Sequence, residues 1–186
     1  MIYIKLKTVN METMKSGSKS SDGNFTALPV LTQTESNTTL WIGHLQTDPT
    51  DHFAGQTFKC PSAGQLDNIQ VYSSTVHQPG HIVLTMHEFD VENKKWGPAI
   101  GNSTIELQRT DRNKWIRFNL QPVPLYKDST YGFRLQTADA LIGIGEAASG
   151  TKQPFNFGQE WNGDSKNEKG HFFTYFSLAF KVELRA

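Results

Sequence analysis

Apolar and polar residues alternate along most of the chain, a pattern that is typical of strands. Residues 81–90 show it most clearly, because Ile82, Leu84 and Met86 share one face while the other face also carries apolar groups. A strand with two apolar faces is expected in the centre of a sheet. No segment repeats apolar residues at helical spacing over a convincing length. Further strands are predicted over residues 39–45, 52–60, 65–73, 100–108, 115–120, 131–137 and 141–144.

The C-terminal segment has the longest alternation. Every second residue from Phe172 to Leu184 is apolar, with the exception of Thr174. This spacing predicts one long strand that crosses a whole sheet and places these residues in the core.

Two local signals refine the predicted strands. The apolar phase breaks after Leu66, which predicts a β-bulge near Asp67 and Asn68. Pro122 and Pro124 have no backbone N–H group to donate, so they are expected to end the strand over residues 115–120.

Short strands joined by turn-rich loops predict an all-β fold, namely an antiparallel β-sandwich of the jelly-roll type. Residues 2–9 also alternate, whereas residues 10–24 contain little that could be buried. We therefore expect residues 1–24 to form an N-terminal strand and a flexible linker, and residues 25–186 to form a single β-sandwich domain.

The composition narrows the classes of function. The 186 residues include 18 basic and 18 acidic side chains, and a neutral chain lacks the basic field that a nucleic-acid partner requires. The single cysteine, Cys60, excludes an intrachain disulfide framework and a cysteine-rich zinc site. No apolar run is long enough to span a membrane. Lysines interrupt what would be the apolar part of an N-terminal secretory signal, so the compartment stays open.

Several short motifs follow one another in a familiar order. They are Gln56-x-Phe58, Leu66-x-x-Ile69-x-Val71-Tyr72, Glu88-x-Asp90, Trp115-x-x-Phe118, and Pro124-Leu125 followed by Tyr131-x-Phe133. Their order over residues 52–137 resembles that of bacterial jelly-roll β-sandwich modules of the carbohydrate-binding type. The resemblance implies an accessory domain that binds a polysaccharide or oligosaccharide, without catalysis, in the extracellular space or at a cell surface.

A sugar site combines an aromatic ring with polar side chains, because sugar rings stack on Trp while amides and carboxylates bind the hydroxyl groups. Trp161 is the first candidate, since it lies in the polar stretch 158–164 of a long predicted loop. We expect Asn162, Asp164 and Gln159 to supply hydrogen bonds beside it.

Two further tryptophans, Trp96 and Trp115, are candidates for a second aromatic wall. Trp96 lies beside a predicted loop, and Trp115 points away from the apolar face of its strand. The alternative for each candidate tryptophan is packing at the rim of the sandwich. Trp41 lies inside a predicted strand and could serve either purpose, with packing as the favoured alternative.

Carboxylates offer little evidence for a metal or for catalysis. Asp90 and Asn93 could bind a structural calcium ion through oxygen, but the favoured alternative is a turn in which Asp90 caps its own backbone. No other cofactor is expected. A glycosidase needs two carboxylates in a cleft, and nothing in the sequence brings the conceivable pair, Glu146 and Glu160, together. We therefore expect no enzymatic activity.

The leading hypothesis is a non-catalytic carbohydrate-binding module that recognises a neutral glycan through loop aromatics and amides. The alternative is a structural or adhesion β-sandwich domain that contacts other proteins in a surface assembly. In that case the second face of the C-terminal strand, with Phe173, Tyr175 and Ala179, would form an exposed apolar surface.

Overall fold

A computed structural model describes residues 27–44, 47–48, 50–150 and 154–185. The N-terminal strand and linker expected over residues 1–24 lie outside the described residues. All strand pairings in the described part are antiparallel, which confirms the predicted all-β class, and its only helical segment is the short 3-10 helix η1 (Arg109–Asp111). The strands are β1 (Ala27–Gln33), β2 (Thr38–His44), β3 (Asp51–Lys59), β4 (Gly64–Gln78), β5 (Gly80–Asp90), β6 (Lys95–Leu107), β7 (Lys114–Leu125), β8 (Thr130–Gln136), β9 (Leu141–Ala148), β10 (Glu160–Asp164), β11 (His171–Phe173), β12 (Phe176–Leu178) and β13 (Phe180–Arg185).

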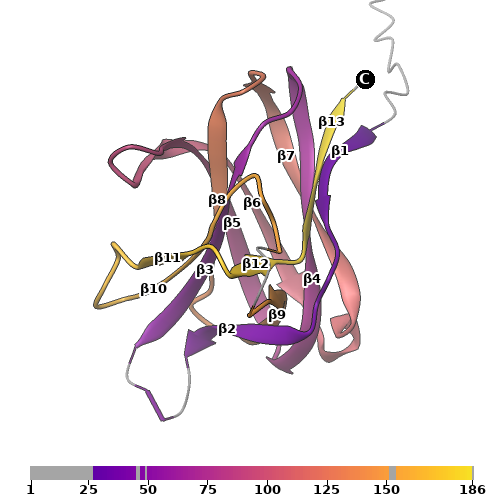
Figure 1. Cartoon of the computed structure of the whole chain (residues 1–186). Helices are drawn as coiled ribbons and strands as arrows, with labels where there is room; N and C mark the ends of the chain where they lie inside the picture. The colour runs from indigo at the N-terminus through magenta and orange to yellow at the C-terminus, as the bar shows by residue number, and fades with distance from the viewer. Residues whose placement is uncertain (1–26, 45–46, 49, 151–153, 186) are drawn as a thin grey trace, which may run out of the picture.

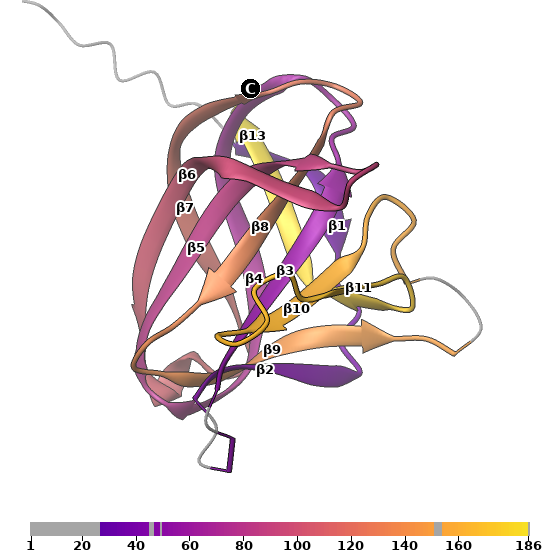
Figure 2. The same ribbon diagram turned by 90° about the vertical axis from the view of Figure 1, so that its left-hand side faces the viewer.

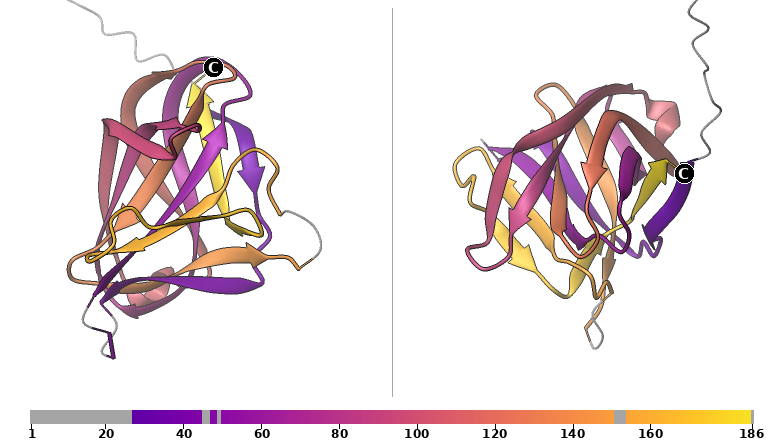
Figure 3. Two further views of the ribbon diagram at one scale, coloured as in Figure 1. Left: turned by 60° about the vertical axis from the view of Figure 1, so that its left-hand side comes forward. Right: turned by 90° about the horizontal axis from the view of Figure 1, so that it is seen from above.

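The strands form two layers around a common interior. One layer consists of β1, β13, β4 and β7, and the other of β6, β5, β8 and β3 (Figure 1). β9 and β2 connect the layers, because β9 pairs with β4 while β2 pairs with both β9 and β3. Seen from above, the two layers enclose the interior (Figure 3). The hairpin of β10 and β11 lies against β3 (Figure 2).

Aromatic side chains from both layers fill the interior. Phe180 of β13 contacts Phe58 of β3 and Phe133 of β8, at ring-centroid distances of 6.2 and 5.6 Å, and all three rings are fully buried. β5 lies between β6 and β8, as predicted for a strand with two apolar faces, and its residues Ile82, Leu84 and Met86 are fully buried.

The structure confirms the predicted β-bulge in β4. The prediction that Pro122 and Pro124 end the strand over residues 115–120 is wrong. The register of β4 against β7 shifts between Leu66 and Asn68. β7 continues through Pro122 and Pro124 to Leu125. Among the described strands, β7 pairs only with β4, so a proline N atom that faces the unpaired side breaks no hydrogen bond.

The C-terminal segment forms three strands, which corrects the prediction of one long strand. β11 pairs with β10, β12 pairs with β9, and β13 pairs with β1 and β4. The chain bends at Thr174 and Tyr175, and Ala179 separates β12 from β13. Ala179 is fully buried, and its N–H donates to the carbonyl of Gly145 at 2.8 Å. β11, β12 and β13 therefore each align with different partner strands, and the chain changes direction between them.

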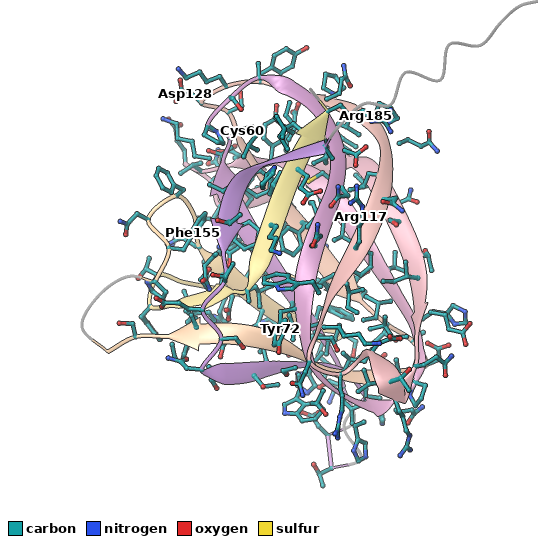
Figure 4. All side chains as sticks on the ribbon, turned by 90° about the vertical axis from the view of Figure 1, so that its right-hand side faces the viewer. Cys60, Tyr72, Arg117, Asp128, Phe155 and Arg185 are labelled. Atoms are coloured by element: carbon teal, nitrogen blue, oxygen red, sulfur yellow. The ribbon has the colours of Figure 1, made fainter. Side chains whose placement is uncertain are left out.

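An ionic network covers the outer face of the β1–β13–β4–β7 layer. Asp67 accepts hydrogen bonds from Arg117 at 2.7 Å and from Arg185 at 2.8 Å, and both arginines lie on this face in Figure 4. Burial opposes ionisation of Asp67, but hydrogen bonds from Asn68 and the two arginines lower its pKa below the ordinary 3.8. The network thus stabilises the pairing of three neighbouring strands.

Candidate functional site

Three strands meet at the beginning of β3 and form a pocket there. Gly43 of β2 and Asp164 of β10 both lie opposite His52 of β3. From this meeting point β2 and β10 run apart (Figure 2). The pocket between them has a volume of about 260 Å³, and we call it the junction pocket; it is lined by Leu40, Trp41, His52, Phe53, Asn162, Gly163, Asp164, Asn167 and His171.

The junction pocket combines an exposed aromatic ring with polar groups that have spare hydrogen-bonding capacity. Trp41 is 36% exposed. The Asn162 side-chain amide forms no hydrogen bond within the described part of the chain, and Asn162 is half-buried. Oδ1 of Asp164 accepts hydrogen bonds from the backbone of Lys166 at 2.8 Å and of Asn167 at 2.9 Å, so Oδ2 can accept a hydrogen bond from a hydroxyl group. A ring beside amide and carboxylate groups suits a polyhydroxylated ligand.

Strand alternation explains why Asn162 and Asp164 reach the same pocket. Side chains two residues apart on a strand share a face, so Asn162 and Asp164 point together while Trp161 points to the opposite side of β10. The sequence predicts a loop here. The structure instead contains β10, because residues 160–164 complete the pairing of β3 along residues 52–56.

Trp161 is fully buried, which corrects the expectation that its ring is the stacking platform. Its Nε1 donates to the carbonyl of Lys169 at 2.9 Å, and the guanidinium of Arg134 covers the ring at 4.5 Å from the centroid. Gly55 and Gly170 contribute no side chain at this place, so β3 and the following loop approach the ring closely. Trp161 therefore anchors the β10–β11 hairpin.

The other three predicted ligand-binding residues lie in separate places. Gln159 lines a pocket of about 300 Å³ together with the exposed Phe157. Trp96 packs edge-on against Trp161, with 5.6 Å between the ring centroids, and lines a different pocket. Trp115 lies on β7 in the opposite layer, where the Nζ of Lys181 lies 4.0 Å from its ring centroid. Only Asn162 and Asp164 share a pocket.

Asp90 and Asn93 form a turn that engages both carboxylate oxygens. The backbone N–H of Asn93 donates to Oδ1 at 3.0 Å, and its Nδ2 donates to Oδ2 at 2.7 Å. These hydrogen bonds lower the pKa of Asp90. Among the described residues, no three His, Cys, Asp or Glu side chains gather as a metal site. Since calcium takes six to eight oxygen ligands, the residues present at this turn do not fit the ion.

Glu146 and Glu160 form a buried carboxyl pair, an arrangement that the sequence does not predict. Glu160 is fully buried, and its carboxyl group shares a hydrogen bond with the carboxyl group of Glu146 when one of the two is protonated. Burial, with the adjacent Glu146 carboxyl, raises the pKa of Glu160 to about 10, and burial also raises the pKa of Glu146. Glu160 is therefore protonated at neutral pH. Neither residue lines the junction pocket.

The sequence favours packing for Trp41 and does not single out His52, Phe53, Asn167 or His171. Trp41, His52, Phe53 and His171 lie on strands, and Asn167 lies between β10 and β11. Alternation identifies a strand but does not show which distant strand or loop lies beside it. In the described residues no helix is long and apolar enough to cross a membrane. A scan against protein-family models and a search of curated proteins both find no match to this chain.

Proposed function

We propose that the protein is a non-catalytic carbohydrate-binding module whose junction pocket recognises a unit of a neutral glycan. The observation that carries this proposal is the exposed ring of Trp41 in one pocket with Asn162 and Asp164. Trp41 would stack on the apolar face of the sugar, while the amide and the carboxylate would bind hydroxyl groups. The order of motifs over residues 52–137, which resembles that of such modules, supports the same function.

The chemistry of the lining favours a neutral ligand. Asp164 is the only acidic residue in the lining of the junction pocket as the structure describes it, and Lys and Arg are absent from that lining. An anionic sugar would therefore meet a carboxylate without a fixed cation beside it. His52 hydrogen-bonds to Asp48 at 3.0 Å, which places its ring against a carboxylate outside the pocket lining.

The position of the carboxyl pair supports binding without hydrolysis. A glycosidase holds its two carboxyl groups on either side of the scissile bond. Glu160 is fully buried and Glu146 nearly so, and neither lines the junction pocket. A sugar in this pocket would therefore lie out of contact with the only buried carboxyl pair in the described structure.

Calorimetric titration with neutral oligosaccharides tests the proposal. We expect saturable binding of at least one member of a panel of gluco-, xylo- and manno-oligosaccharides. Trp41→Ala should weaken that binding about 10-fold or more, because it removes the stacking surface. Trp115→Ala is the matched control, since it removes a tryptophan from the opposite layer. Binding that is unaffected by Trp41→Ala, or absent throughout the panel, would refute the proposal.

A second candidate function, protein–protein contact, has one observation in its favour. Tyr175 is 52% exposed and contacts Phe173 and Phe176, with ring centroids 5.8 and 4.8 Å away. Phe173 and Phe176 are half-buried, and aromatic side chains that cluster at a surface are typical of interfaces. Ala179 is buried and does not contribute. Sedimentation at increasing concentration distinguishes this candidate, because self-association that Tyr175→Ser abolishes would favour it.

A further inference from the structure

Arg134 is a half-buried arginine without an acidic partner in hydrogen-bonding contact. It lies in β8, opposite Gly55 of β3 and Thr85 of β5. Its Nε is shielded from solvent and has no hydrogen-bond partner among the residues described. Arg185, which is also half-buried, instead donates to Asp67 at 2.8 Å. The guanidinium stacks on the buried ring of Trp161, and Arg134 also lines the adjoining pocket, so its terminal N–H groups can donate to an oxyanion that binds there.

The pocket beside Arg134 concentrates positive charge. It has a volume of about 610 Å³, lies between the β5–β6 turn and the β10–β11 loop, and is called here the arginine pocket. Lys94, Lys95 and Lys169 line it together with Arg134, and Glu168 is its only acidic residue in the described structure. The whole chain has no net charge, so this excess of cations is local and attracts anions.

Two aromatic rings also line the arginine pocket. The rings of Trp96 and Phe172 lie stacked, with centroids 6.0 Å apart and an interplanar angle of 28°. The Nε1 of Trp96 is also shielded and lacks a hydrogen-bond partner within the described structure. The volume is in the range of small-molecule sites and exceeds what an inorganic ion requires. The pocket therefore offers cations for an acidic group and rings for the body of the same molecule.

We propose that the arginine pocket binds the carboxylate of an organic acid of monosaccharide size, such as a uronic acid. The guanidinium of Arg134 donates hydrogen bonds to the carboxylate. Because both groups are planar, they can form two parallel hydrogen bonds. The ring of the ligand then lies against Trp96 and Phe172. This pocket shares no lining residue with the junction pocket, so the proposal does not depend on binding of a neutral glycan.

The test uses D-glucuronate, with D-glucose as the matched neutral compound, and observes the indole N–H signals of the four tryptophans by NMR. Glucuronate should shift the signal of Trp96. It should also shift the signal of Trp161, because the Nε1 of Trp161 donates a hydrogen bond to the backbone carbonyl of Lys169, a residue that lines the pocket. The signal of Trp115, in the opposite layer, should stay in place. Glucose should leave the Trp96 and Trp161 signals unchanged.

Arg134→Gln should weaken glucuronate binding roughly 10- to 100-fold, because charge-assisted hydrogen bonds are lost. Arg112→Gln is the control, since Arg112 is exposed and does not line the pocket. If Arg134→Gln does not fold, the double variant Lys94→Gln/Lys95→Gln on the exposed turn should weaken binding roughly 3- to 10-fold. A uronic-acid oligosaccharide that binds more tightly than glucuronate would support a glycan as the source, and equal affinity would support a free acid.

Three results would overturn the proposal. One is a folded wild-type protein that binds glucuronate no better than glucose. Another is a folded Arg134→Gln variant with unchanged affinity for glucuronate. The third is unchanged affinity in the double lysine variant. None of these results bears on neutral-glycan binding at Trp41, so failure of one site is distinguishable from failure of the other.

Discussion

Glu160→Gln should make the protein more stable at neutral and alkaline pH. Glu160 is fully buried beside Glu146 and has no basic partner among the described residues, so burial raises its pKa to about 10. In the unfolded chain the same carboxyl group ionises near its ordinary value of 4.5. Above pH 4.5 the folded state therefore binds one proton that the unfolded state releases, and the free energy of unfolding falls as the pH rises.

The size of the effect follows from the two pKa values. Each pH unit between them lowers the free energy of unfolding by about 1.4 kcal/mol for one proton. Stability is fully present below pH 4.5 and is lost progressively up to about pH 10. At pH 7 the loss from this group amounts to about 3 kcal/mol. Glutamine has nearly the same shape as glutamate and cannot ionise. The free energy of unfolding of the variant therefore lacks the pH dependence that Glu160 causes in the wild type.

The assay is urea unfolding of the wild type and the variant at several pH values. Between about pH 5.5 and about pH 8, the stability of the variant relative to the wild type should rise by about 3 kcal/mol. Glu92→Gln, on the exposed β5–β6 turn, is the matched control and should follow the wild type. An identical pH dependence of Glu160→Gln and the wild type would refute the reasoning. It would mean that Glu160 is ionised in the folded protein or already solvated.

Two further predictions concern the packing of the strands. Gly55→Ala places a Cβ atom 2.8 Å from the carbonyl oxygen of Phe133. The variant should therefore be less stable than the wild type by about 1–3 kcal/mol in urea unfolding. Gly150→Ala is the control and should leave the stability unchanged, because Gly150 has open space around it. Asp67→Asn removes the negative charge and one of the two oxygens that accept hydrogen bonds from Arg117 and Arg185, and it should lower stability by about 1 kcal/mol at pH 7. Because the pKa of Asp67 is lowered, this difference should fade as the pH falls below 3.8, and Asp128→Asn, in an exposed ion pair, should show little effect.

The regular strands could be predicted from the sequence because their signal is local. Ile82, Leu84 and Met86 alternate with half-buried residues, and β5 lies in the centre of its layer as that pattern predicts. The bulge at Leu66 and Asn68 has an equally local cause, since the apolar phase changes there. Patterns within about ten residues therefore identified the all-β class.

Predictions failed where a distant partner decides the conformation. Residues 160–164 form a strand because they pair with residues 52–56, more than a hundred positions away. The C-terminal alternation continues across Ala179, but three different partners divide that segment into three strands. Period-two patterns do not identify the neighbour of a strand.

The sequence predicts only part of the candidate site, because strands that lie far apart in the chain meet at the junction pocket. Asn162 and Asp164 share a pocket, as residues two apart on a strand can. Alternation also turns Trp161 away from them and into the interior of the hairpin, which a loop assignment does not reveal. The aromatic ring of the pocket comes instead from Trp41, on a strand paired with β9. No local signal joins Trp41 to β10.

The most direct test of glycan binding follows the indole N–H signal of Trp41 during titration with neutral oligosaccharides. We predict a saturable shift of this signal with at least one oligosaccharide, while the signal of Trp115 in the opposite layer stays in place. If no neutral oligosaccharide moves the Trp41 signal, or if all four tryptophan signals move alike, the junction pocket is not a glycan site.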